Sequence, residues 1–178
     1  FYTVREFTKN AKDFAKTCKR VKKIGYDGVQ LSAIGPIPPK EIQKILSGEG
    51  LECVATHISF DRIEKETNAV IDEHLMWGCR YPAIVGFFPQ GGTGLKLKTW
   101  KDFVKRFNKC AALLAEAGLS LGYHNHFHEF LKLPDGLTCY EHLIRELDPF
   151  NAWFEIDTYW VAYAGKEPSA LIRRLPHR

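Results

Sequence analysis

Helix-like and strand-like segments alternate along this sequence, and this alternation restricts the fold more than any other feature. Five times, a segment with apolar residues at helical spacing is followed by a short apolar run with the character of a strand. Repeated helix-then-strand order is typical of parallel α/β proteins. The expected helices are 8–23, 39–46, 63–77, 99–117 and 139–147, and the expected strands are 28–32, 51–57, 81–86, 119–126 and 152–157.

Two parallel α/β architectures fit this order, a doubly wound sheet and a (β/α)8 barrel. A dinucleotide-binding sheet would carry a GxGxxG turn after its first strand, and the sequence contains no such turn. Polar residues gather instead at the expected C-terminal ends of strands, at His57, His124, His126 and Asp157. TIM barrels build their active sites there, although open sheets also bind ligands near strand ends. We therefore expect a (β/α)8 TIM barrel.

The chain length indicates how much of such a barrel is present. Residues 1–4 are expected to end a first strand and 167–175 to form a sixth helix, which makes six strands. The sequence has 178 residues, whereas an ordinary barrel takes ~250. The expectation is one domain, residues 1–178, with about six of the eight βα units and truncation at both ends.

Composition excludes several classes of protein. The net charge is +4 and basic residues are spread along the chain, so we expect no nucleic-acid partner. No apolar run approaches the ~20 residues that span a bilayer, so we expect no membrane segment. The five cysteines show no paired spacing, which argues against disulfides and zinc ribbons and favours the reducing cytoplasm.

The segment 121–130 is the most informative for chemistry. Side chains alternate along a strand, so His124 and His126 are expected to share one face while Tyr123 and Asn125 take the other. Two neighbouring imidazoles can bind a divalent metal or transfer protons near neutral pH. His128 makes three histidines in five residues, and together with Glu129 this strengthens the prediction of a functional site.

The segment 153–160 adds carboxylates. Alternation predicts that Glu155 and Asp157 face the same way, and two carboxylates in an apolar strand need a partner or a cation. A buried salt bridge, or a helix cap formed by Asp157, is the structural alternative. Trp160 and Phe88 could line a sugar pocket, with core packing equally compatible.

Single histidines outside these segments carry weaker signals. His57 ends the third expected strand and gains weight only because a barrel brings strand ends to one mouth. His74 and His142 lie within expected helices, where we predict surface positions.

Three motifs together resemble the sugar phosphate isomerase/epimerase family of xylose isomerase-like TIM barrels. They are Ile24-Gly25-Tyr26-Asp27-Gly28-Val29-Gln30-Leu31, Gly122-Tyr123-His124-Asn125-His126 with Glu129-Phe130, and Phe154-Glu155-Ile156-Asp157-Thr158-Tyr159-Trp160. The resemblance runs through nearly the whole chain in the same order. It implies one divalent ion, with manganese, cobalt, zinc or magnesium as candidates.

The resemblance also implies roles for individual residues. Asp157 matches the metal-binding aspartate of the sixth strand, and His124 stands where many relatives carry a glutamate ligand, with His126 as the alternative ligand. Glu129 resembles an acidic residue that contacts substrate, and His57 matches a pocket histidine of the third strand. The family's remaining ligands come from strands seven and eight, which lie beyond the sequence.

The resemblance therefore implies a metal-dependent isomerase, epimerase or related dehydratase. It would act on a sugar, keto-sugar or cyclitol by removing a proton next to a carbonyl, with Glu129 or His126 as the base. Two alternatives stay open: a metal-dependent nuclease resembling the apurinic endonucleases, and a sugar-binding barrel without catalysis. A homo-oligomer is compatible with the sequence.

Overall fold

The computed structural model describes residues 1–87 and 96–176, and within these ranges five strands form one sheet. Hydrogen bonds order the strands β1-β2-β3-β4-β5, and the pairs β1–β2, β2–β3 and β4–β5 are parallel. The chain divides into two compact units within β3, which are described separately below. The first unit is Phe1–Ala83 with Ala117–Leu119, and the second is Ile84–Glu116 with Ser120–Arg178.

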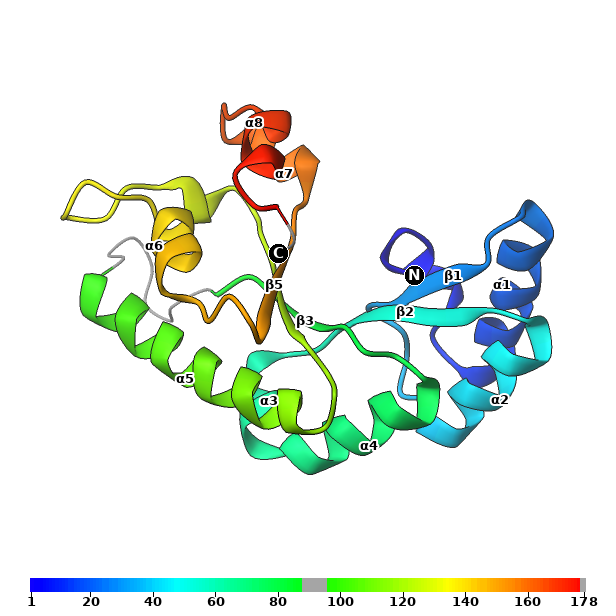
Figure 1. Cartoon of the computed structure of the whole chain (residues 1–178). Helices are drawn as coiled ribbons and strands as arrows, with labels where there is room; N and C mark the ends of the chain where they lie inside the picture. The colour runs from blue at the N-terminus through cyan, green and yellow to red at the C-terminus, as the bar shows by residue number, and fades with distance from the viewer. Residues whose placement is uncertain (88–95, 177–178) are drawn as a thin grey trace. The chain divides into compact units, whose positions relative to one another are not determined.

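Helices and strands alternate as the sequence predicts, with shorter strands (Figure 1). The strands are β1 (Gly28–Leu31), β2 (Glu52–His57), β3 (Pro82–Val85), β4 (Leu121–His124) and β5 (Ala152–Glu155). Helix α1 (Ala11–Ile24) precedes β1, and the helices between the strands are α2 (Pro39–Glu49), α3 (Phe60–Lys65), α4 (Thr67–Trp77), α5 (Leu97–Glu116) and α6 (Cys139–Glu146). Two short helices, α7 (Thr158–Tyr163) and α8 (Pro168–Arg173), follow β5.

The first unit packs α1 and α2 against the β1–β2 pair, with apolar residues from each element in one core. Phe14 and Cys18 from α1 are completely buried there, next to Leu46 of α2. A glycine ends each of these helices because glycine adopts the left-handed conformation of a helix C-cap without a steric penalty. Gly25 and Gly50 both have this conformation, with φ of 112° and 64°.

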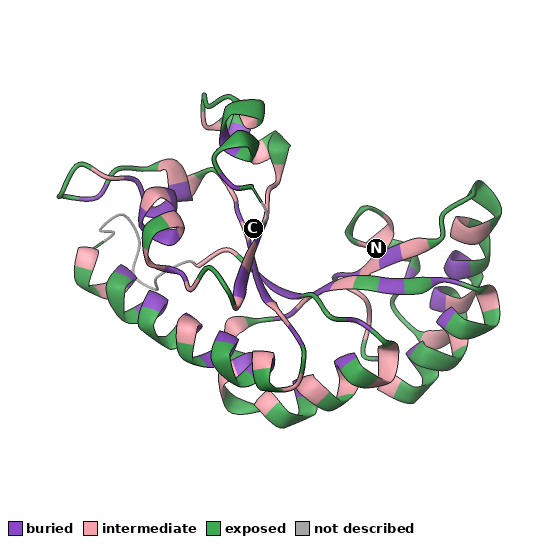
Figure 2. Ribbon diagram, viewed as in Figure 1, coloured by how far each residue is buried: buried purple, intermediate pink, exposed green. Residues whose placement is uncertain are grey.

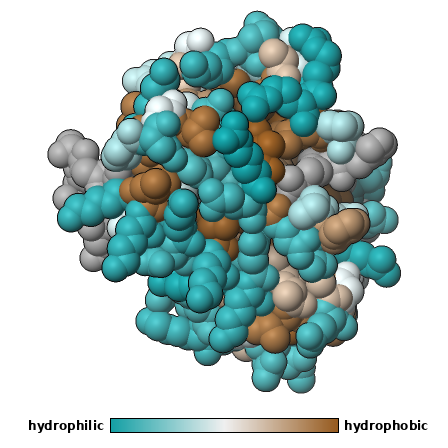
Figure 3. All heavy atoms as spheres, turned by 60° about the vertical axis from the view of Figure 1, so that its left-hand side comes forward, coloured by the Kyte–Doolittle hydropathy of each residue, from teal (hydrophilic) through white to brown (hydrophobic). Residues whose placement is uncertain are grey.

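The second unit builds its core on the apolar stripe of α5. Phe103, Phe107, Ala111 and Leu114 are all buried, as helical spacing predicts. The ring of Phe103 lies 6.0 Å from that of Tyr123 on β4, so helix and strand share one aromatic core. The outward side of α5 is exposed (Figure 2). Hydrophilic residues cover most of the face that Figure 3 brings forward.

The pairing of β4 with β5 fixes where the polar residues meet. In its register, Gly122 lies opposite Trp153, and His124 lies opposite Glu155. The indole of Trp153 lies against Gly122, where a Cβ atom would overlap the ring. Its Nε1 also donates a hydrogen bond of 2.9 Å to the carbonyl of Ser120. A side chain at position 122 would therefore disturb the strand pair that carries His124.

Several expectations are wrong at the level of local structure. Residues 1–4 do not form a strand: Tyr2–Phe7 is a 3-10 helix, η1. The helix expected over 63–77 is interrupted at Glu66, whose φ of −128° and ψ of 34° are not helical, and Ser59 caps the preceding α3. The described residues therefore hold five strands rather than six.

His74 and His142 are buried, which corrects their predicted surface positions. The Nδ1 of His74 lies 2.7 Å from the carbonyl of Val70, and its Nε2 lies 2.7 Å from the hydroxyl of Thr56. His142 contacts a carboxylate with each ring nitrogen. A polar residue in a helix can thus face the core when its buried polar atoms have hydrogen-bond partners. No helix in the described ranges combines the length and apolarity needed to cross a bilayer.

The burial of His74 predicts acid sensitivity. Burial lowers the pKa of His74 below 6.5; Arg62 acts in the same direction, and the bond to Val70 and the charge of Glu73 oppose it. Below about pH 6.5 the unfolded chain then takes up a proton that the folded chain excludes, so stability is lost as pH falls. The loss is at most about 1.4 kcal/mol per pH unit from this residue. The loss is measured by urea unfolding of the parent and of His74→Gln at about pH 7.5 and about pH 5.5. Equal pH dependence in the two proteins would contradict the prediction.

The contact between Gly122 and Trp153 predicts opposite effects for two glycine substitutions. Gly122→Ala should lower the free energy of unfolding by about 1–3 kcal/mol, because the new methyl group overpacks against the indole. Gly48→Ala is the control: Gly48 lies in α2 with open space around its Cβ position. There the change should raise stability by about 0.5–1 kcal/mol. Chemical denaturation of both variants tests this, and equal stability changes would argue against the packing described.

Candidate active site

Strand β4 delivers His124 to the site. The strand ends at His124, two residues earlier than predicted, so His126 lies in the segment that follows it. Tyr123 faces the core and is completely buried, whereas His124 turns to the other side with 12% of its side chain exposed. The rings of His124 and His126 are nevertheless neighbours, with centroids 5.2 Å apart.

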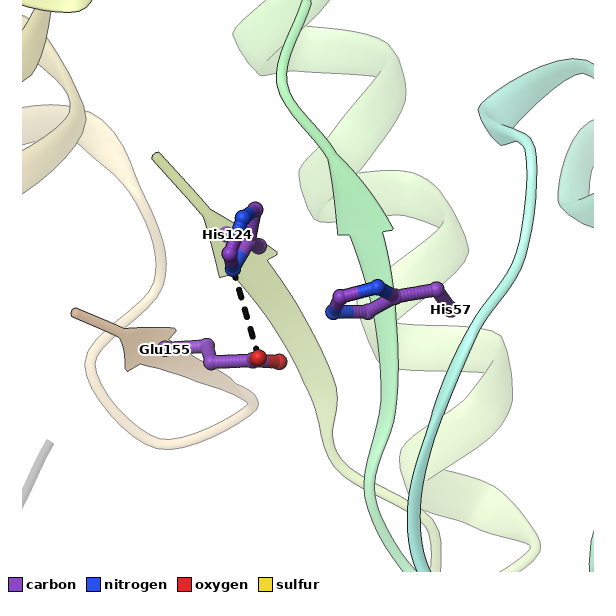
Figure 4. Close-up of side chains that lie close together, drawn as sticks. All are labelled: His57, His124 and Glu155. Atoms are coloured by element: carbon purple, nitrogen blue, oxygen red, sulfur yellow. Dashed lines mark hydrogen bonds and ion pairs between the residues drawn. The ribbon is translucent and has the colours of Figure 1, made fainter. Parts of the chain in front are cut away.

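His124 lies between two carboxylates that come from the end of β5. Its Nδ1 is 3.2 Å from Oε1 of Glu155 (Figure 4). Its Nε2 is 3.7 Å from Oδ2 of Asp157, beyond hydrogen-bond length. Both carboxylates are partly buried, with 24% and 27% of their side chains exposed. Glu155 and Asp157 therefore contact the same histidine, in agreement with their expected shared face.

Asp157 also has a structural role. Its Oδ1 accepts a hydrogen bond of 3.2 Å from the backbone N–H of Trp160 and so caps α7. The helix-cap alternative is therefore present in the structure, through one carboxylate oxygen. The other oxygen is the atom that faces His124. One aspartate can thus begin the helix and still offer Oδ2 to a ligand.

Asn125 is a residue that sequence reasoning did not assign. It is completely buried, and its Oδ1 accepts a hydrogen bond of 3.0 Å from the backbone N–H of Asp157. Its Nδ2 donates to the carbonyl of Asp157 over 3.3 Å. Asn125 thereby ties the end of β4 to the residue after β5. Alternation placed its side chain away from His124, but gave no signal for a bond to a residue 32 positions later.

His126 lies among aromatic rings. Its ring is 5.3 Å from that of Trp160 and 5.7 Å from that of His128. Burial lowers the pKa of His126 below its ordinary value; the charge of Glu129 opposes this shift, and His124 adds to it. The ring is therefore neutral near neutral pH.

Glu129 is completely buried within a hydrogen-bond network. One oxygen, Oε1, accepts from the hydroxyl of Tyr123 over 2.8 Å, and Oε2 accepts from the backbone N–H of His126 over 2.9 Å. Burial and the nearby Glu129 carboxylate raise the pKa of Tyr123, so the phenol keeps the proton that it donates. Glu129 thus holds the backbone of His126 in place.

Three predicted residues remain to be placed: His57, Phe88 and Trp160. His57 belongs to the first unit, where its Nδ1 lies 2.8 Å from the hydroxyl of Ser32 and its Nε2 3.1 Å from Nε2 of Gln30. It lines a cavity of about 410 Å³ whose wall includes Arg62 and Trp77. Phe88 lies outside the residues that the structure describes. Trp160 contacts His126, Phe127 and Tyr163 through its ring.

The donor atoms of the second unit fit a divalent metal. Metal–ligand bonds of about 2.0–2.2 Å place two ligand atoms of one ion roughly 3–4 Å apart. The 3.7 Å between Nε2 of His124 and Oδ2 of Asp157 lies in this range. A second group, His126, His128 and Glu129, holds possible ligand atoms within 4.8 Å of one another. Its Glu129 oxygens already accept hydrogen bonds, so the pair His124 and Asp157 is the better candidate for a metal site.

No protein-family model and no curated protein sequence matches the chain. Several solved structures do match the chain. A sugar phosphate isomerase/epimerase from Parabacteroides distasonis superposes with a TM-score of 0.81 at 20% identity, over 94% of this chain and 67% of that chain. A D-psicose 3-epimerase with D-tagatose from Clostridium cellulolyticum gives a TM-score of 0.69 at 15% identity, over 95% and 66%.

A third structure, a xylose isomerase-like TIM barrel protein from Mycobacterium smegmatis in complex with magnesium, gives a TM-score of 0.68 at 14% identity. That match covers 93% of this chain and 63% of the other. The chain thus spans about two thirds of the length of these three structures. Identities this low carry information on the fold alone. On that basis the chain has the fold of the xylose isomerase-like TIM barrels, to which the sequence motifs pointed.

Proposed function

We propose that this chain belongs to a metal-dependent isomerase, epimerase or related dehydratase acting on a sugar, keto-sugar or cyclitol. The observation that carries the proposal is the placement of His124 between Glu155 and Asp157, with His126 beside it. Two metal-ligand side chains and a neutral imidazole at adjacent strand ends suit proton removal next to a carbonyl. Two of the similar structures support this proposal, because one is described as a sugar phosphate isomerase/epimerase and the other as a D-psicose 3-epimerase.

Asp157 and His124 would hold the ion. A bound divalent cation would polarise a substrate carbonyl and its neighbouring hydroxyl, which stabilises the negative charge left by proton removal. Manganese, cobalt, zinc and magnesium are the candidate ions, and the imidazole donor favours zinc over magnesium, which prefers oxygen ligands. The carboxylate of Asp157 stays anchored while it binds, because its other oxygen caps α7.

His126 is the proposed base. Its ring lies next to that of His124, whereas both carboxylate oxygens of Glu129 are engaged inside the protein. The imidazole would take the proton from the carbon next to the carbonyl and, in an isomerase, return it to the neighbouring carbon. Glu129 supports this role through the backbone of His126, and Trp160 offers an aromatic face to the sugar. His57 is proposed as a pocket residue of the first unit.

The cytoplasm is the proposed location. All five cysteines are buried as thiols. Thiols of this kind are typical of proteins from a reducing compartment.

Asp157→Asn tests the metal role with little disturbance of the fold. Asparagine caps helices about as well as aspartate, so α7 should keep its first turn. Loss of the charged ligand should lower affinity for Mn²⁺ or Co²⁺ by at least about tenfold. Turnover, measured as deuterium exchange from D2O into a panel of ketoses, should fall to background. Isothermal titration calorimetry measures the affinity.

Asp148→Asn is the matched control. Asp148 also accepts a backbone hydrogen bond, from the N–H of Phe150 over 2.9 Å, and lies in the same unit. This variant should bind metal and exchange deuterium as the parent does. Equal metal affinity in Asp157→Asn and the parent would remove Asp157 from the metal site.

A metal-dependent nuclease is the second candidate, favoured by one observation. The group His126, His128 and Glu129 adds three possible ligands beside His124, and nucleases that use several metal ions need such additional donors. Incubation with a duplex that contains an abasic site would decide between the two activities. Strand cleavage that requires the added metal, without ketose exchange, would replace the isomerase proposal.

A further inference from the structure

Glu155 contacts His124 but has no role assigned to it in the proposed reaction. It is the last residue of β5 and, in the register of the parallel pair, stands opposite His124, the last residue of β4. Its side chain is partly buried, with 24% exposed. Burying a carboxylate is unfavourable unless a partner compensates it, and the Nδ1 of His124 at 3.2 Å is such a partner.

We propose that Glu155 is a positioning residue that fixes the ring orientation and tautomer of His124, so that Nε2 is presented as a metal ligand. This inference rests on the proposed metal role of His124. An ionised carboxylate only accepts hydrogen bonds, so the contact requires the proton of the imidazole to sit on Nδ1. The lone pair is then on Nε2, the atom that faces Oδ2 of Asp157.

The gap between Nε2 and Asp157 supports this assignment. Two acceptor atoms that face each other repel, and a cation between them removes the repulsion. At 3.7 Å the two atoms are too far apart to share a hydrogen bond, but the spacing suits two ligands of one metal ion. Carboxylate–histidine–metal arrangements use this geometry to orient the ring and raise the basicity of the ligand nitrogen.

The same unit contains a histidine with a different arrangement. His142 lies 2.7 Å from a carboxylate oxygen of Glu146 through Nδ1 and 2.9 Å from one of Asp135 through Nε2. Both distances are of hydrogen-bond length. At His124 the contact of Nδ1 with Glu155 is a hydrogen bond, whereas Nε2 lies 3.7 Å from Oδ2 of Asp157, beyond hydrogen-bond length. The two histidines thus differ in the distance at which Nε2 meets a carboxylate.

The test reads the tautomer of His124 directly. Long-range ¹H–¹⁵N NMR spectra of the full chain without metal, at a pH where histidines are neutral, distinguish protonation of Nδ1 from that of Nε2. His124→Gln assigns the signal. We expect the Nδ1–H tautomer in the parent and a mixture of the Nδ1–H and Nε2–H tautomers in Glu155→Ala. Glu155→Gln should keep part of the preference for the Nδ1–H tautomer, because its amide oxygen still accepts a hydrogen bond. Mn²⁺ affinity should fall about 10- to 100-fold in Glu155→Ala and less in Glu155→Gln.

Glu146→Ala is the matched control, because it removes a carboxylate from the Nδ1 of another histidine of the same unit. It should change neither the His124 signal nor Mn²⁺ affinity. An unchanged tautomer in Glu155→Ala, or an imidazolium in the parent, would overturn the inference. If the tautomer depends on Glu155 but the parent binds no Mn²⁺, the proposed metal function fails while the hold of Glu155 on His124 stands.

Discussion

The pairing of β4 with β5 is the interaction on which the candidate site depends. Its register sets His124 opposite Glu155, and a shift by one residue would turn His124 away from both carboxylates. Two contacts hold this register: the indole of Trp153 over Gly122, and the amide of Asn125 on the backbone of Asp157. The first requires a residue without a side chain, and the second requires both a donor and an acceptor. The chemistry at the strand ends thus rests on packing and hydrogen bonds behind it.

A buried polar network supports the segment after β4. The carboxylate of Glu129 accepts from the hydroxyl of Tyr123 and from the backbone of His126, and the same hydroxyl lies 2.8 Å from the N–H of Phe87. Burying a carboxylate is tolerated only when its hydrogen bonds are made, so these partners must form together. The network connects the end of β3, strand β4 and the proposed base. A residue that the sequence suggested as a catalytic group thereby has a clear structural purpose.

Local periodicity explains what could be predicted from the sequence. The stripe of α5, the left-handed glycines after α1 and α2, and the shared direction of Glu155 and Asp157 all follow from geometry within one element. Contacts between elements could not be predicted this way. Asn125 depends on the register of a partner strand, and the burial of His74 depends on Thr56 from a different strand. The periodicity of the sequence likewise does not indicate that β4 ends at His124 or that Tyr2–Phe7 forms a 3-10 helix.

The central claim is that His124 and Asp157 share one metal ion, and anomalous diffraction from a crystal soaked in Mn²⁺ tests it most directly. The account predicts one strong anomalous peak about 2.0–2.2 Å from Nε2 of His124 and from Oδ2 of Asp157, with Glu155 still bonded to Nδ1. A peak among His126, His128 and Glu129, or no peak in the second unit, would contradict it.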